Sequence, residues 1–302
     1  MHSARETWFL LVSFPFYAIL IGTEILLSNW KHKGLYTLKD TLQNIYLTLV
    51  NAGLDILLRW AFYVSVLNWA FLHQLFRVEN VVAYWFLLFI LEDLAFYIEH
   101  RIDHYCRFFW AIHVTHHSST EFNLTTGFRS SVLQPLYRFI YFIPLAFSGF
   151  HPLDIVFMYS LTQTYGILVH TRTIKKMPRW FESVFVSPSH HRVHHASNPI
   201  YLDKNMGMCL IIWDRLFGSF QEEIEEEPVR YGLTKSVDHL GHPGKLIFHE
   251  WQSIARDMAK DLPLAIRLKY LFMPPGWSHD GKGLTARQMR KQFKSTICLN
   301  RQ

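Results

Sequence analysis

The amino-acid sequence predicts an all-α protein: a polytopic membrane helical bundle of four to five spans, with a cytoplasmic helical cap that carries a histidine-rich site for two metal ions. Three observations predict this class. Half of the 302 residues are hydrophobic and only 18% are charged, the apolar residues gather in long runs, and 18 residues are histidine. Soluble domains have roughly a quarter of charged residues, so the composition excludes a disordered chain and argues against an ordinary cytosolic domain.

Net charge and cysteine content exclude other classes. The net charge of +6 suits either nucleic acid or an acidic membrane surface. The sequence contains no recognised nucleic-acid motif, so we expect no nucleic-acid partner and assign the positive charge to a membrane. Cys106, Cys209 and Cys298 are too few and too scattered for a disulfide framework or a zinc ribbon.

Five apolar runs predict the membrane spans. Residues 8–28 match the ~20 residues that a helix needs to cross a bilayer, with Glu24 as the one carboxylate. Residues 42–72 carry Asp55 and Arg59, whose spacing of four lets the two charges pair within a helix. The remaining runs are 81–99, 132–149 and 153–170, of which the last two are joined by a hairpin turn at 150–152. A soluble protein with buried helices is the alternative.

Lysine and arginine positions predict the orientation of these spans. Three lysines separate the first two spans and three arginines follow the third, whereas the other two connections hold one cation between them. The lysines are Lys31, Lys33 and Lys39, and the arginines are Arg101, Arg107 and Arg129. Arg77 is the one cation in the other two connections. The positive-inside rule therefore places 29–41, 100–131 and everything after 170 in the cytoplasm.

The chain divides into three segments. Residues 1–80 hold the N-terminal membrane spans, 81–232 hold the histidine-rich domain, and 233–302 form a cytoplasmic C-terminal tail. Two amphipathic stretches lie near 245–260 and 264–272. The acidic run at 221–227 we interpret as a solvated face.

Ten histidines carry the functional prediction, because they gather in three groups with helical spacing and at one further position near the end of the last span. They are His100 and His104; His113, His116 and His117; His190, His191, His194 and His195; and His170. Spacings of three and four residues direct side chains to one side of a helix. Neutral imidazole is a good ligand for iron, zinc, copper and nickel.

The predicted topology brings these groups together. An even number of crossings separates the second group from the third, so all the groups return to one face of the bundle. Eight or nine imidazoles exceed what one first-row ion binds, so we expect two metal ions. Asp93 lies within about 40° of His100 and His104 on the helix surface and suits an acceptor that orients a metal-bound imidazole. The alternative for Asp93 is a buried polar residue bonded to another helix.

The motifs from Glu92 to Gly232 resemble the fatty acid hydroxylase superfamily, which includes the sterol desaturases. EDLAFYIEHRIDH, WAIHVTHH and SPSHHRVHHASNPIYLDKNMG are the matching segments. The likeness is closest to the alkylglycerol monooxygenase group and its bacterial relatives. One departure is Tyr105, which stands where that group has a glutamate after the first histidine box. PPGWSHDGKG near the C-terminus resembles the tail of bacterial members, which favours a bacterial inner membrane over the endoplasmic reticulum.

The resemblance implies a non-haem di-iron centre that activates O₂ and hydroxylates, or desaturates, a lipid such as a sterol, a fatty acyl chain or an alkylglycerol. The implied ligands to the two iron ions are His100, His104, His113, His116, His117, His170, His191, His194 and His195. His190 stays undecided. The resemblance further implies a lipid substrate that enters from the bilayer. A separate electron donor is also implied, either a reduced tetrahydropterin or a protein of the cytochrome b5 or ferredoxin type.

Two other functions remain open from the sequence. A membrane metallohydrolase with a dinuclear zinc site would need a carboxylate base near its ligands. His249-Glu250, the one His-Glu pair, has no histidine four residues on. A bis-histidine haem protein of electron transfer would use two axial ligands and leave the other histidines unexplained.

Overall fold

The computed structural model describes residues 2–59, 63–235 and 242–299. Within these residues the fold is helical, and its one β-contact is an isolated bridge between Phe185 and Leu210. This confirms the all-α prediction. The α-helices are α1 (His2–Trp30), α2 (Leu38–Leu58), α3 (Val64–Leu72), α4 (Val81–Tyr105), α5 (Arg107–His117), α6 (Ile143–Phe147), α7 (Pro152–Leu168), α8 (Arg179–Val184), α9 (Pro188–His194), α10 (Ile212–Phe217), α11 (Pro243–Met258), α12 (Leu264–Phe272) and α13 (Ala286–Leu299). The short 3₁₀ helices are η2 (Thr126–Phe128), η3 (Gln134–Leu136), η4 (Arg138–Phe142) and η5 (Pro199–Tyr201).

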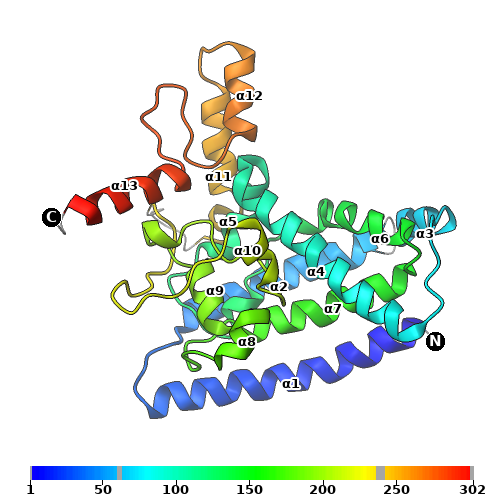
Figure 1. The fold of residues 1–302 in the computed structure, drawn as a ribbon. Coiled ribbons are helices and arrows are strands. Elements are labelled where there is room, and N and C mark those ends of the chain that lie inside the picture. The colour runs from blue at the N-terminus through cyan, green and yellow to red at the C-terminus, as the bar shows by residue number, and fades with distance from the viewer. Residues whose placement is uncertain (1, 60–62, 236–241, 300–302) are drawn as a thin grey trace.

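Two of the described helices are long and apolar enough to cross a membrane: Leu11–Trp30 within α1, and α4. They correspond to the first and third predicted spans. α1 lies along α7 (Figure 1), where the Tyr17 hydroxyl donates to Thr164 Oγ1 at 2.7 Å. Trp8, Phe14 and Trp30 are exposed on α1, as is expected of a helix that faces lipid.

Glu24, the carboxylate within this first apolar run, is buried. Its oxygens accept hydrogen bonds from the Leu124 amide at 2.9 Å and from the hydroxyls of Tyr36 and Thr171. A carboxylate in an apolar segment is costly unless it finds such donors. Glu24 therefore ties α1 to the loops that surround the histidine-rich domain.

The second predicted span corresponds to α2 and α3, with residues 60–62 outside the described part of the chain. Asp55 and Arg59 pair as predicted, with 2.5 Å between Asp55 Oδ2 and an Arg59 guanidinium nitrogen. That this region crosses a membrane stays a prediction, as does the total of four to five spans.

The fourth predicted span, 132–149, is wrong as a single helix. It consists of η3, η4 and α6, and its longest apolar helical stretch is Arg138–Phe147. At ~1.5 Å per residue this stretch is roughly 15 Å long, about half of a ~30 Å hydrocarbon core. Pro135 and Pro144 lie in the first turns of η3 and α6, where the missing proline N–H is tolerated but could not continue a longer helix.

The fifth predicted span is continuous as α7. Gly149, with φ +92°, makes the turn before it, and a Cβ there would lie 2.3 Å from Phe76 O. The turn therefore requires glycine. The His151 side chain then accepts a hydrogen bond from the Leu153 amide, and Pro152 takes the first position of α7.

α4 is the centre of the bundle and contacts α5, α6 and α7 (Figure 1). Leu88, Ala95, Phe142, Phe150 and Ile155 belong to the main apolar cluster around it. The end of α4 that emerges from this cluster carries the first histidine group, so the core fixes where that group lies.

The C-terminal half departs from expectation in one respect. α11 and α12 confirm the two predicted amphipathic stretches. The acidic run at 221–227 is only partly a solvated face, because Glu223 pairs with Arg192 of α9 at 2.7 Å. Glu227 likewise accepts from Asn198 Nδ2 at 2.7 Å. The run therefore holds α9 and the loop after it in place.

Candidate metal centre

The first two histidine groups face each other across a sharp corner. α4 and α5 are joined by Cys106 alone, whose extended backbone (φ −120°, ψ 119°) turns the chain. The ring centroids of His100 and His113 are consequently 4.8 Å apart, as are those of His104 and His117. Helical spacing on both sides of the corner directs these four imidazoles to one point.

The third group is positioned by the start of α9. Ser187 Oγ accepts from the His190 amide, and His190 Nδ1 accepts from the Ser187 amide, each at 3.3 Å. This is a capping box, with Pro188 at the first helical position. His190, which the sequence left undecided, thus acts in the helix cap and packs its ring on Phe220, 5.5 Å between centroids.

His170 follows the end of α7 and joins the third group. Its Nε2 lies 2.9 Å from His191 Nε2 and 3.1 Å from His195 Nε2. Its Nδ1 lies 2.6 Å from Gly166 O, so this nitrogen carries the proton.

All nine predicted histidines lie in two adjacent groups, in each of which the possible ligand atoms are within 4.8 Å of one another. The five-histidine group consists of His100, His104, His113, His117 and His194, and the four-histidine group of His116, His170, His191 and His195. The groups touch, because the rings of His117 and His195 stack at 4.5 Å. The predicted convergence of the three sequence groups is confirmed.

The loop Asp203–Met206 orients three imidazoles of the five-histidine group. Met206 O lies 2.8 Å from His100 Nδ1, Lys204 O lies 3.0 Å from His194 Nδ1, and Asp203 Oδ1 lies 3.3 Å from His104 Nδ1. An acceptor at Nδ1 leaves the lone pair on Nε2, which is the nitrogen that points into the group. Asp203 and Asn205 both have positive φ (50° and 54°), an uncommon backbone state for non-glycine residues.

Asp103 is a second carboxylate behind this group that the sequence did not reveal. Asp103 Oδ2 lies 3.6 Å from His113 Nδ1. The carboxylate also accepts from Tyr137 OH at 2.7 Å and from Gln134 Nε2 at 3.0 Å. Its position directly before His104 was the available signal, but which imidazole it approaches depends on the corner at Cys106.

Asp93, the predicted partner of an imidazole, contacts no histidine among its described hydrogen bonds. Its carboxylate accepts from the amides of Cys209 at 2.8 Å and Leu210 at 3.1 Å, and from Trp213 Nε1 at 2.9 Å. These bonds match the alternative, a buried polar residue bonded to another segment. Asp93 anchors the chain before α10 to α4.

Burial favours the uncharged form of the imidazoles in these groups. Burial lowers the pKa of His116 to about 4, and burial together with neighbouring imidazoles holds the pKa values of His117, His194 and His195 well below 6.5. Protonation of several adjacent buried rings would bring like charges together in a medium of low polarity. Neutral rings are the state in which imidazole binds metals.

Aromatic side chains enclose the two groups. Trp110 lies against His104 and His117, with centroids 5.1 and 5.5 Å apart. Phe122 lies 5.4 Å from His170 and stacks on Tyr231 at 4.9 Å with 5° between their planes. Tyr105, the residue that departs from the family pattern, lies outside both groups under the Arg101 guanidinium.

Several known proteins are similar to this chain. Residues 85–219 match the family model of the fatty acid hydroxylases. Alkylglycerol monooxygenase of Homo sapiens is 34% identical over 272 residues, which cover 87% of this chain and 58% of the human protein. No solved structure is significantly similar.

Two further relatives are more distant. Ornithine lipid hydroxylase OlsE of Rhizobium tropici is 26% identical over 49% of this chain and 45% of its own length. Delta(7)-sterol 5(6)-desaturase ERG3B of Gibberella zeae is 26% identical over 52% of this chain and 49% of its own length. The chain thus spans about half the length of these curated relatives.

Proposed function

We propose that the chain, whose residues 85–219 match the family model of the fatty acid hydroxylases, is a membrane-bound, O₂-dependent di-iron enzyme that hydroxylates a lipid. Desaturation of the same substrate class is the finer alternative. The observation that carries the proposal is the pair of adjacent histidine groups, five and four, within the matched region.

The donor set fits two metal ions. Nine imidazoles gather in the two groups, and five of them have Nδ1 at a hydrogen-bond acceptor, which leaves the Nε2 lone pair for a metal ion: His100, His104, His116, His170 and His194. His104 Nε2 and His194 Nε2 are buried and have no hydrogen-bond partner among the described residues. Such orphaned acceptors are costly unless a cation shares them. No carboxylate belongs to either group, which separates this site from those of hydrolases with a carboxylate base near the metal.

The protein has three tasks in this chemistry. Iron at these imidazoles would supply O₂ activation, for which two electrons come from a separate donor. The Asp203–Met206 loop holds His100, His104 and His194 in one tautomer and orientation, and the Asp103 carboxylate places negative charge near His113. Trp110, Phe122 and Tyr231 surround the groups and restrict access of water.

The substrate class is supported by the placement of the site and by the relatives. α4 carries His100 and His104 at the end of an apolar helix long enough to span a membrane. An alkyl chain can therefore approach from the bilayer. The relatives are named for alkylglycerol, ornithine lipid and sterol substrates, so we propose a lipid as the substrate of this chain too.

The cellular placement is also a proposal. The excess of lysine and arginine on the side of the histidine groups favours a cytoplasmic site. We propose an integral membrane protein of the bacterial inner membrane, with the endoplasmic reticulum as the second choice.

The test is metal content joined to product analysis. We expect two iron ions per purified chain, and incorporation of one ¹⁸O atom from ¹⁸O₂ into an extracted lipid when a reductant is supplied. His194→Ala removes both signals, whereas His249→Asn, on the half-exposed face of α11, leaves them unchanged. Stoichiometric zinc with no lipid oxidation after reconstitution with iron would contradict the proposal, and a Soret band would point to haem instead.

A further inference from the structure

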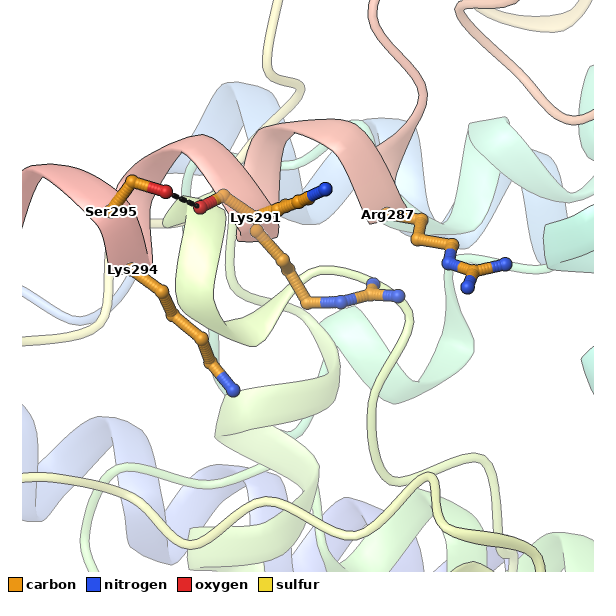
Figure 2. A pocket seen from close by; sticks show the side chains of 5 residues that line it. Arg287, Lys291, Lys294 and Ser295 are labelled. Carbon is orange, nitrogen blue, oxygen red and sulfur yellow. Dashed lines mark hydrogen bonds between the residues drawn. The ribbon is translucent and has the colours of Figure 1, made fainter.

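α13 presents a cationic face. Its residues Ala286–Leu299 include no Asp or Glu. Arg287, Arg290, Lys291 and Lys294 line an open cavity of about 540 Å³ together with Ser295. Figure 2 shows Arg287, Lys291 and Lys294 extending from one helix in different directions, while Ser295 Oγ donates to Lys291 O at 3.0 Å.

Most of this charge is uncompensated. Among the described residues, Arg287, Lys291 and Lys294 have no carboxylate within ion-pair distance. Arg290 alone approaches one, at 3.7 Å from Asp203 Oδ2. Clustered cations without partners create a local positive potential that attracts an acidic molecule.

The cationic face lies next to the metal centre. Asp203 accepts from His104 Nδ1 with one oxygen, at 3.3 Å, and faces Arg290 with the other. Arg290 also donates to Leu202 O, and α13 packs on η5, the turn that comes after α9. A molecule bound at Arg290 is therefore linked to His104 of the five-histidine group through Asp203.

We propose that the cationic face of α13 is the docking surface for an acidic electron-carrier protein, one that bears an iron–sulfur cluster or a b-type haem. This rests on the proposed function. Hydroxylation consumes one O₂, two electrons and two protons for each lipid C–H: one oxygen atom enters the C–H bond and the other leaves as water. A carrier protein that delivers one electron at a time has to visit twice per turnover, so it must dock close to the metals and dissociate quickly. Charge complementarity favours such transient encounters.

The composition of the face favours a protein over a lipid surface. The exposed described residues of α13 are all polar, and its apolar Met289 and Phe293 are only half-exposed. The apolar exposed stripe of this region lies instead on α12, at Leu264, Leu268 and Phe272. A membrane would be recognised by that stripe, whereas the exposed side chains of α13 offer charge and hydrogen-bonding groups.

The experiment compares two triple charge reversals in the full chain, held in neutral phosphatidylcholine nanodiscs. R287E/K291E/K294E reverses the face, and K33E/K39E/K245E is the matched control of three exposed lysines elsewhere. Binding of an acidic [2Fe–2S] ferredoxin is measured by biolayer interferometry, and turnover is measured with that ferredoxin or with reduced phenazine methosulfate, which is small and uncharged. We expect the reversal to slow ferredoxin association by roughly 10- to 100-fold at low salt, and to leave turnover with the small reductant unchanged.

The outcomes separate this proposal from the proposed function. Equal ferredoxin binding by the reversed and control variants overturns the docking surface. The docking surface is also overturned if the reversal abolishes binding to vesicles with 30% phosphatidylglycerol but leaves binding to ferredoxin intact. It is overturned likewise if the natural chain turns over with a tetrahydropterin and no protein donor. If no reductant supports turnover but ferredoxin binding still depends on α13, the oxygenase function fails and the docking surface stands.

Discussion

The two histidine groups differ in the acceptors that lie behind their imidazoles. In the five-histidine group, carboxylates approach two of the Nδ1 atoms: Asp203 at His104 and Asp103 at His113. In the four-histidine group the acceptors are backbone carbonyls, such as Gly166 O behind His170. A carboxylate makes a stronger hydrogen bond than a carbonyl and makes the imidazole a stronger ligand.

This difference indicates that the two sites are not equivalent. The five-histidine group has more ligands and anionic support, so we expect it to bind its metal more tightly. The four-histidine group has fewer ligands and lies against Phe122, so a metal ion held there would keep a coordination position for O₂ or water. Substitutions directed at one group or the other test that inequality.

The largest effect is expected for His194→Ala and His195→Ala. These adjacent residues belong to different groups. Each substitution should remove one of two metal ions and lower turnover by more than about 100-fold, the upper range for losing a residue that only supports a ligand. Metal per chain, measured by mass spectrometry, tests this. A loss of both ions from each variant would show that the two groups form one cooperative site.

A smaller effect is expected for Asp203→Asn. The amide still offers an oxygen to His104 but removes the negative charge behind the ring. Metal affinity should fall by about 10- to 100-fold in the five-histidine group alone. Dialysis against a graded chelator should then remove one ion early, in contrast to the natural chain. Asp280→Asn, at an exposed aspartate, is the control and should not change the order of release.

Gly127→Ala should disturb only the four-histidine group. A Cβ at Gly127 would lie 3.0 Å from Ile167 Cα and 3.1 Å from His170 Nδ1, so the end of α7 must shift. Since a 1 Å misplacement costs about 100-fold in rate, a shift of a few tenths of an ångström should cost roughly 10-fold. Gly53→Ala, which meets nothing within 4 Å, is the matched control. Unchanged turnover in Gly127→Ala would mean that His170 tolerates displacement.

The smallest effect is expected for Tyr231→Leu. Tyr231 stacks on Phe122 and is not paired with an imidazole in the described ring contacts. Loss of the stack should lower the free energy of unfolding by about 0.5–1.5 kcal/mol. Both metal ions should stay bound. Thermal unfolding followed by tryptophan fluorescence measures this, with the exposed Tyr46→Leu as the reference. Release of an ion would assign Tyr231 to the four-histidine site itself.

The sequence predicted which histidines gather because helical spacing is a local property. His100 and His104, or His113 and His117, share a helix face wherever the helix lies. His170 was included because it lies near the end of the last predicted span and because the family resemblance implied it as a ligand, and the structure places it with the third group. His190 stayed open because its role depends on the cap at Ser187, which is a matter of a single helix start.

The contacts behind the imidazoles were not predictable in the same way. A helical wheel placed Asp93 on the face of His100 and His104 but did not show that the Cys209 and Leu210 amides lie closer to it. Asp203 reaches His104 across 99 residues of sequence, a contact that no spacing encodes. Hydropathy likewise counted 132–149 as a span, although Pro135 and Pro144 divide it.

The single-residue corner at Cys106 constrains how this protein can vary. Each residue added to a helix rotates all later positions of that helix by about 100°. One extra residue in α5 before His113 would therefore turn His113, His116 and His117 away from both groups together. The number of residues between the first two histidine boxes is therefore fixed by the geometry of the two histidine groups. Variation in substrate choice has to arise in other segments, where the length of the chain can change without displacing these histidines.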